Sequence, residues 1–490
     1  MALLKRLKDD DSMDKEMFLP TAKLADFDAA PINLKYVPSL GDTVYARADH
    51  MSRPIELCEE IAAGGEGRIF GTNLDGFVAK IFKQERLDTG KEKKIRLMTS
   101  KQINCPGICF PIAALYNKEN KFVGYLMRQA KGAELGRSVF LPPMLAKIFP
   151  TWKKKDMVRL CVTILEKMKY LHDRNVILGD INPANILVVS PKEVYFVDTD
   201  SYQVEGFPCP VGMPNFVAPE IQNKNFKKFL RTKGNEHFAI ATLLFMVMLP
   251  GQKPYAKKGS SGNLMENIKK MDFSYDMQGE PGEHVPSGMW GPIWSHLPIA
   301  VRGAFYHTFH ESGLHNCEAT RYTVEEWLLK FQNYLIELEL GKLGARDQNS
   351  EKIFPRELSK AVLQGAVQTM GPVLQPSQNE PILMYGLMDV TANVEKVMTC
   401  LEALKVAGSR TVLLKVLKGQ DAVLREFLNR DDVDRALMFT VFGSLKSLSS
   451  TELNHLIDYL VLDEYLDPGS GRKKIMTVTS KGQPYVRCPA

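Results

Sequence analysis

One segment of this 490-residue chain constrains its fold more than any other, LGDINPANILVVSPKEVYFVDTD at residues 178–200. Asp180 stands five residues before Asn185, and a second acid, Asp198, follows an apolar run. Two short apolar runs between these residues predict a pair of strands, which would hold both acid-bearing turns at the mouth of one cleft. Carboxylate and amide oxygens are the ligands that Mg²⁺ prefers, so the spacing favours a metal site beside a further carboxylate. Taken singly, each of these residues is also an ordinary turn former.

A glycine-rich block lies upstream, IAAGGEGRIF at residues 61–70 followed by FVAKIF at residues 77–82. The pattern predicts strand, glycine turn, strand, turn and strand. Lys80 would emerge from the third strand as a cation that pairs with phosphate groups. A glycine cluster alone is typical of a hairpin, and it is the coupling to Lys80 that favours a phosphate site. The glycines that would let backbone N–H groups approach phosphate oxygens are Gly64, Gly65 and Gly67.

Five such blocks stand in the order found in protein kinases, and the chain resembles that superfamily from about Pro54 to Leu335. The phrases GGEGRIF, GYLMRQAKG, LGDINPANILV, FVDTDSYQ, PCPVGMPNFVAPE and EHFAIATLLF are most similar to bacterial protein-kinase-like proteins related to those that carry helix-hairpin-helix domains. The resemblance implies an α+β fold with two lobes, a β-rich N-lobe and a helical C-lobe.

The resemblance and the composition together suggest the domain boundaries. We expect an N-terminal extension over residues 1–50 and a protein-kinase-like domain over 51–338, and the polar residues 339–352 read as a linker. Within the kinase-like domain the expected parts are the N-lobe (51–127), the hinge (128–131) and the C-lobe (132–338). The sequence pattern of residues 353–490 predicts a mainly helical C-terminal domain that ends in a basic hairpin. Such a domain is compatible with a winged-helix-like module or with a helical adaptor.

The resemblance also implies roles for four residues. Asp180 would accept or orient the proton of an acceptor hydroxyl, and Lys80 would pair with the phosphates of ATP. Asn185 and Asp198 would hold Mg²⁺, with Mn²⁺ as an alternative ion. Because degenerate members of the superfamily usually lose one of these four residues, their presence favours an active enzyme.

The surroundings of the nucleotide follow from the same resemblance. Met127 would stand at the gate behind the adenine, and backbone groups near Ala130 in the hinge would hold its edge. Ala62 replaces the first glycine of the family pattern. The apolar sandwich around the ring would consist of Ile69, Ala79 and Leu187.

Lys80 needs a carboxylate that aims its ammonium group. The segment KEKKIRLM at residues 91–98 has helical character, and we expect its acid, Glu92, to be the partner. Glu85 is the alternative, although it follows the strand so closely that a solvent-facing position is favoured.

Two structural features of the large lobe are expected. Ala218-Pro219-Glu220 resembles the end of an activation segment, and its acid would pair with Arg321; losing either partner should cost about 3–5 kcal/mol. Glu236, near the start of a buried apolar helix, replaces the acid that anchors the catalytic loop in the family.

The chain also departs from the family. Leu178 and Gly179 replace the His and Arg before the catalytic acid, which predicts that no cation lies beside Asp180 and that phosphorylation of the activation segment is not required. Asn182 and Met213 replace a Lys and a Thr of the same small network, so transfer could be slow or use another donor.

Composition bounds the remaining choices. A net charge of +6 over this length is too small to imply nucleic acid, the eight cysteines show no framework spacing, and no apolar stretch of membrane-spanning length appears. These limits agree with a cytoplasmic protein, and the resemblance implies a Mg-ATP-dependent kinase acting on protein Ser/Thr hydroxyls, with an unidentified protein substrate. The alternative is a nucleotide-binding pseudokinase that acts as a scaffold. In either case the C-terminal domain would bind a protein partner, with nucleic acid the less favoured ligand.

Overall fold

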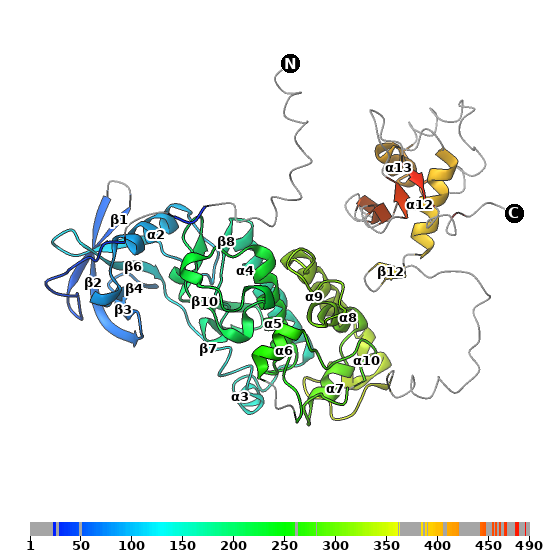
Figure 1. Cartoon of the computed structure of the whole chain (residues 1–490), viewed down its shortest axis with the longest axis horizontal. Coiled ribbons are helices and arrows are strands. Elements are labelled where there is room, and N and C mark those ends of the chain that lie inside the picture. The colour runs from blue at the N-terminus through cyan, green and yellow to red at the C-terminus, as the bar shows by residue number, and fades with distance from the viewer. Residues whose placement is uncertain are drawn as a thin grey trace, which may run out of the picture. The chain divides into compact units, whose positions relative to one another are not determined.

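The computed structural model divides the chain into two compact units, residues 1–367 and 368–490, and each is described by itself (Figure 1). The structure describes residues 23–25, 29–48, 51–259, 263–280, 282–360 and 362 of the first unit. In the second unit it describes residues 384–385, 388–389, 391–404, 409–420, 442–446, 453–454, 456–457, 460–461, 465–467, 476–479 and 486.

The N-lobe is a closed barrel with the strand order β1-β2-β3-β4-β6-β5, and all of its neighbouring strands are antiparallel. Its strands are β1 (Thr43–Ala48), β2 (Met51–Ala63), β3 (Gly67–Thr72), β4 (Phe77–Phe82), β5 (Ala113–Tyr116) and β6 (Phe122–Arg128). Alternate residues of the strands fill the barrel, among them Val44, Phe70, Ile81 and Leu115. Because β1 belongs to this barrel, the lobe begins before residue 51, and the expected boundary there is wrong.

Helix α2 (Thr89–Ser100) packs beside β5 and carries the expected helical segment. Asp88 caps its N-terminus by accepting a hydrogen bond from the backbone N–H of Lys91 at 2.7 Å. Ile95 and Met98 are fully buried, as their three-residue spacing predicted. The face of α2 that carries them is therefore fixed against the core of the lobe.

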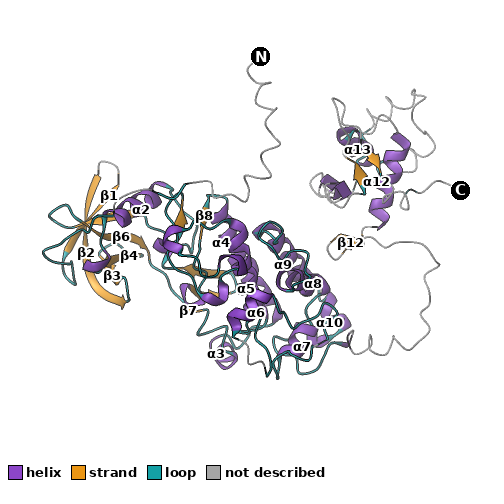
Figure 2. Ribbon diagram, viewed as in Figure 1, coloured by secondary structure: helices purple, strands orange, loops and turns teal. Residues whose placement is uncertain are grey.

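The C-lobe is helical, with short strands at the end that meets the N-lobe (Figure 2). Its helices are α3 (Pro142–Ile148), α4 (Lys154–His172), α5 (Lys233–Met248), α6 (Leu264–Lys270), α7 (Trp290–Ser295), α8 (Ile299–Phe309), α9 (Val324–Glu339) and α10 (Lys342–Arg346). One sheet has the order β10-β9-β7, and a second pairs β11 with β8. These strands are β7 (Ala133–Glu134), β8 (Val176–Ile177), β9 (Ile186–Ser190), β10 (Glu193–Phe196) and β11 (Gln203–Val204).

Helix α5 forms the centre of the lobe. Thr232 and Asn235 form a reciprocal capping box at its start, and every residue from Gly234 to Met248 is buried. Its apolar sequence thus fits a helix covered on all sides by protein. Across the described residues, no helix combines the length and the apolar character needed to cross a bilayer.

Residues 339–352 are folded, contrary to the expected linker. They form α10 and a 3₁₀ helix, Gln348–Glu351, and Ile353 beyond them is buried in the main core. Asp347 fixes the segment, because its side chain accepts hydrogen bonds from the backbone N–H groups of Asn349 and Lys360 at 3.0 Å each. The first unit accordingly extends past residue 352, up to residue 367.

The C-terminal unit has a core of its own, to which Val397, Leu413 and Leu456 contribute. Its described helices are α12 (Thr391–Leu404) and α13 (Arg410–Leu417), in line with the expected helical character. β12 (Met384–Tyr385) pairs with β13 (Met388–Asp389), and β14 (Leu466–Asp467) pairs with β15 (Thr477–Val478), both antiparallel. The last pair lies where the basic hairpin was expected, but the residues between its strands lie outside the described part of the chain.

Candidate active site

A cavity of about 310 Å³ lies between the barrel and the turn at Asp198. Apolar side chains from β2, β3, β4, β6 and β9 form most of its lining, and Lys80 and Asp198 give it a charged end. An apolar pocket with a few convergent polar groups suits a ligand that has a flat ring at one end and anionic groups at the other. Six residues expected around a nucleotide line it, namely Ala62, Ile69, Lys80, Met127, Ala130 and Leu187.

Ala79 does not line the cavity, contrary to expectation. Its side chain belongs to the barrel core, whereas Val78 lines the cavity beside Lys80. Successive residues of a strand point to opposite faces, so the residue on the face of Lys80 is two positions away, at residue 78. This alternation was available in the sequence and would have identified Val78.

The glycine turn joins β2 to β3, and the N–H of Gly64 donates to the carbonyl of Gly67 at 2.9 Å. A Cβ on Gly67 would lie 2.4 Å from the carbonyl oxygen of Ile81, so only glycine allows β3 to approach β4 this closely. Gly64 and Gly65 have open space around them, which leaves their backbone accessible. These three glycines are not among the residues that line the cavity.

The hairpin of β9 and β10 brings the two expected metal ligands together. The carbonyl of Asn185 accepts from the N–H of Val197 at 2.9 Å, which sets Asn185 beside the turn that begins at Asp198. Asp198 has the left-handed backbone conformation, with φ of 56°, and its side chain is 47% exposed. An amide and an accessible carboxylate fit a hard divalent cation, and these two residues would hold it.

Lys80 is bound by two carboxylates of that turn. Its Nζ lies 2.6 Å from Oδ1 of Asp198 and 2.7 Å from Oδ1 of Asp200, and the hydroxyl of Tyr125 donates to the same Asp200 oxygen at 2.7 Å. Burial opposes the charge on Asp200, but the Lys80 ammonium outweighs it and lowers the pKa of that carboxyl to about 2. Both charges of the Lys80–Asp200 pair are therefore retained inside the fold.

Glu92, the expected partner of Lys80, contacts a different residue. Its carboxylate accepts a hydrogen bond from the Tyr116 hydroxyl at 3.0 Å, and no ion pair joins it to Lys80 among the described residues. The inward position of α2 is taken by a cation, Lys94, which donates to the carbonyls of Ser201 and Pro208 at 3.1 and 3.4 Å. Glu92 as the residue that aims Lys80 is accordingly a wrong prediction.

Asp180 is half-buried on the loop that follows β8. Burial raises the pKa of its carboxyl, although the Arg231 guanidinium and the backbone N–H of Met213 act in the opposite direction. Glu236, which replaces the family acid, anchors the loop by accepting from the backbone N–H groups of Leu178 and Gly179 at 3.0 and 2.5 Å. A carboxyl whose pKa is raised in this way is better matched to accepting a proton near neutral pH.

Arg231 supplies the cation that the sequence was expected to lack beside Asp180. It is buried just before α5 and donates to the carbonyls of Cys209 and Val211 at 2.9 and 2.7 Å. A Cβ at Gly179 would lie 2.5 Å from the Cβ of Cys209 and 2.8 Å from the Arg231 guanidinium. The glycine that replaces the family arginine therefore leaves the space that Arg231 fills from another part of the chain.

The substituted residues of the small network near Asp180 have local roles. The side chain of Asn182 accepts from the N–H of Ala184 at 2.9 Å and so caps the 3₁₀ helix Pro183–Asn185. The carbonyl of Met213 accepts from the N–H of Phe216 at 2.8 Å. Asn182 thus supports the turn that carries Asn185.

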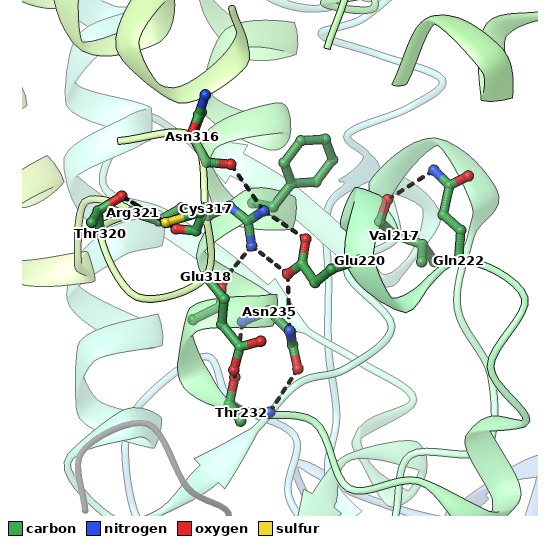
Figure 3. A network of polar contacts seen from close by, with 12 residues as sticks. Val217, Glu220, Gln222, Thr232, Asn235, Asn316, Cys317, Glu318, Thr320 and Arg321 are labelled. Carbon is green, nitrogen blue, oxygen red and sulfur yellow. Dashed lines mark hydrogen bonds and ion pairs between the residues drawn. The ribbon is translucent and has the colours of Figure 1, made fainter. Parts of the chain in front are cut away.

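The end of the activation segment is locked by the predicted ion pair (Figure 3). Arg321 binds Glu220 through two hydrogen bonds of 2.6 and 2.7 Å and also donates to the carbonyls of Gly234 and Asn316. Asn235 donates to the same carboxylate at 2.9 Å. The burial of Arg321 and the hydrogen bonds of both its Nη groups make the pair a structural element of the C-lobe.

These features define a two-lobed protein whose largely apolar cavity has Lys80 and Asp198 at its charged end. Residues 63–331, more than half of the chain, match the family model of the protein kinase domain. The chain belongs to the protein kinase family. Residues 385–489 match the model of the RQC domain.

Curated relatives share the same region at low identity. Protein kinase YegI of Escherichia coli strain K12 is 25% identical over 286 residues, which are 56% of this chain and 43% of the relative. Serine/threonine-protein kinase D2 of Rattus norvegicus is 23% identical over 308 residues, 58% of this chain and 30% of the relative. The chain thus spans less than half the length of these relatives. The bacterial likeness is supported, whereas the link to helix-hairpin-helix proteins stays a prediction.

Proposed function

We propose that this protein is an atypical protein kinase that transfers the γ-phosphoryl group of Mg-ATP to Ser or Thr hydroxyls of proteins. The observation that carries the proposal is the contact of Lys80 with Asp198 at the charged end of an otherwise apolar cavity. Matches to the protein kinase family and to relatives named as serine/threonine kinases support it.

Each residue has one task in the proposed reaction. Bound Mg-ATP supplies the phosphoryl group and an ion that neutralises its charge. Lys80 pairs with the phosphates, and Asn185 and Asp198 hold the ion. Asp180 accepts or orients the proton of the acceptor hydroxyl, for which burial has already raised the pKa of its carboxyl.

The adenine is assigned to the apolar part of the cavity. Val78 and Leu187 line it, and Met127 closes it beside the hinge. Ala130 makes no backbone hydrogen bond within the described part of the chain, so its N–H and carbonyl remain available to the edge of the base. A ring held there points its phosphates toward Lys80.

The departures from the family set the expected rate. Asn182 caps its own turn and provides no cation at the position of the family lysine. Loss of one preorganised donor costs roughly 10²–10³ in rate, so we expect slow transfer unless the acceptor or another residue replaces it.

The test is transfer of label from γ-labelled ATP to the full chain and to a generic protein acceptor, for wild type, Asp180→Asn and Asp198→Asn. We expect label on Ser or Thr with wild type and a drop of about 10²-fold or more with each variant. Absence of label from wild type that binds ATP tightly would instead support the scaffold alternative. Asp75→Asn, a change at an exposed residue between β3 and β4, serves as the matched control.

The RQC match favours nucleic acid as a ligand of the C-terminal unit, over the helical adaptor that composition alone suggested. Fluorescence anisotropy with labelled duplex DNA and RNA, in rising salt, would measure this. A salt-dependent affinity that is absent from a chain ending at residue 367 would support the assignment.

A further inference from the structure

We propose that Asp200 is the positioning residue that orients Lys80 in the proposed phosphoryl transfer, in place of a carboxylate from α2. The inference rests on the proposed function, in which Lys80 pairs with the phosphates. It is carried by one cluster, in which the Lys80 ammonium, the Asp200 carboxylate and the Tyr125 hydroxyl meet through two contacts of 2.7 Å each.

The two carboxylates on Lys80 differ in exposure. The side chain of Asp198 is 47% exposed, whereas that of Asp200 is 4% exposed. Asp198 is thus open to a bound ion and can leave Lys80 when that ion arrives. Asp200 does not line the cavity, and its near-complete burial keeps it on Lys80.

Helix α2 cannot supply the carboxylate. Glu92 is the one acid of this fully described helix, and its carboxylate is bound by Tyr116. The buried residue of α2 nearest the turn is a cation, Lys94, whose ammonium donates to backbone carbonyls of the activation segment. The Asp200 carboxylate contacts the Lys80 ammonium and also lies close enough to Lys94 to attract that second cation.

The arrangement changes what controls Lys80. A carboxylate on α2 would make the position of Lys80 depend on the position of that helix. Asp200 lies on the 3₁₀ helix Thr199–Ser201, directly after the metal-binding Asp198. The phosphate-pairing cation and the metal ligand are therefore fixed by one turn, and α2 serves to hold the activation segment through Lys94.

A double-mutant cycle in the full chain tests this. ATP affinity and the KM and kcat of transfer would be measured for wild type, Lys80→Met, Asp200→Asn and the double variant. We expect Asp200→Asn to weaken ATP binding and raise its KM by roughly 10- to 100-fold, the loss typical of one charge-assisted hydrogen bond. Because Asp200 acts through Lys80, adding Asp200→Asn to Lys80→Met should change the affinity by less than about 2-fold.

Two further variants keep the test sharp if Asp200→Asn folds poorly. Tyr125→Phe removes the hydroxyl that holds Asp200 without changing a charge, and we expect about 3- to 10-fold weaker ATP binding. Glu92→Gln is the isosteric control on α2, expected within about 2-fold of wild type in KM. Thermal unfolding of each variant shows which of them are folded.

The outcomes separate this inference from the proposed function. Equal losses from Asp200→Asn in the wild-type and Lys80→Met backgrounds, or a Glu92→Gln loss as large as that of Lys80→Met, overturn the role of Asp200. A purely structural role would lower kcat with KM unchanged and would overturn it as well. Wild type that binds ATP but transfers no label contradicts the proposed function, and the affinity cycle then still decides the role of Asp200.

Discussion

Two ion pairs in the first unit, each with a buried cation, have different roles. Glu220–Arg321 is bidentate and lies outside the cavity lining, and its additional hydrogen-bond partners in Figure 3 belong to the C-lobe. Lys80–Asp200 is a single contact whose cation lines the cavity. Both Nη groups of Arg321 in the first pair hydrogen-bond the C-lobe, whereas the cation of the second pair faces the cavity. Burial of a charge alone therefore does not tell structure from function; what matters is whether the charge still faces a cavity.

The largest expected effect breaks the structural pair. Arg321→Met should lower the free energy of unfolding by about 2–4 kcal/mol, because it removes the hydrogen bonds of a buried guanidinium, whereas the Glu220 side chain is 32% exposed and keeps some access to water. Urea unfolding measures the loss. Kinetics on the remaining folded protein should show a nearly unchanged KM for ATP, in contrast to Asp200→Asn.

A matched control exists on the surface. Arg159 pairs with Glu339 at 2.6 Å, with side chains 31% and 49% exposed. Exposed pairs contribute about 0–1 kcal/mol, so Arg159→Met should cost far less than Arg321→Met. Equal losses from the two variants would refute the structural role given to Glu220–Arg321.

The two pairs also differ in how well the sequence predicted them. Glu220 ends a recognisable motif, and Arg321 shortly precedes the amphipathic helix α9, so both partners could be named before the structure was known. Asp200 stands where the family has a glycine, and Arg231 comes from an unpatterned stretch before α5. No sequence periodicity predicts either residue. Each takes the place of a family side chain that lies elsewhere in the family's sequence pattern.

Other errors had a local cause. The alternation of β4 would have placed Val78, and not Ala79, on the face of Lys80. By contrast, the folding of residues 339–352 rests on the Asp347 side chain, which binds the N–H of Lys360 thirteen residues away. The polar composition of that segment gave no sign of it, because capping by one side chain leaves no pattern in the composition.

A smaller loss of stability is expected on substitution of Arg231, whose contacts concern both the fold of the activation segment and the surroundings of Asp180. Its guanidinium binds two carbonyls of the activation segment beside Asp180. Arg231→Lys keeps the charge but cannot span both acceptors, and it should cost about 1.5–3 kcal/mol of stability and lower the proposed transfer. Urea unfolding and label transfer would be measured together.

The alternative view of Arg231 is that phosphate, not carbonyl groups, is its partner. Transfer that rises after prior incubation with ATP, and falls again on phosphatase treatment, would favour that view. If Arg231→Lys matches wild type in both stability and transfer, Arg231 does not hold the activation segment.

The smallest effect concerns pH and tests the surroundings of the structural pair. Burial, with nearby His172 and Arg321 adding to it, lowers the pKa of His237 to about 3, so this residue is neutral in the folded protein. The unfolded chain then binds one more proton between about pH 6.5 and 3, and stability falls as the pH is lowered through that window. From pH 6.5 to 5 the loss should be about 1.6 kcal/mol, because the unfolded histidine is only half protonated at pH 6.5 and the full slope of about 1.4 kcal/mol per pH unit is reached at lower pH.

Replacing His237 should remove this contribution. His237→Phe keeps a buried ring, and urea unfolding between pH 7 and 5 should show a slope against pH that is smaller by about one proton. His296, whose pKa is also lowered by burial, remains and keeps part of the slope. His284, which is exposed, provides the control variant His284→Gln. A slope unchanged by His237→Phe would mean that His237 is protonated in the folded protein, close to Arg321. The surroundings of the Glu220–Arg321 pair would then be more polar than the burial of Arg321 indicates.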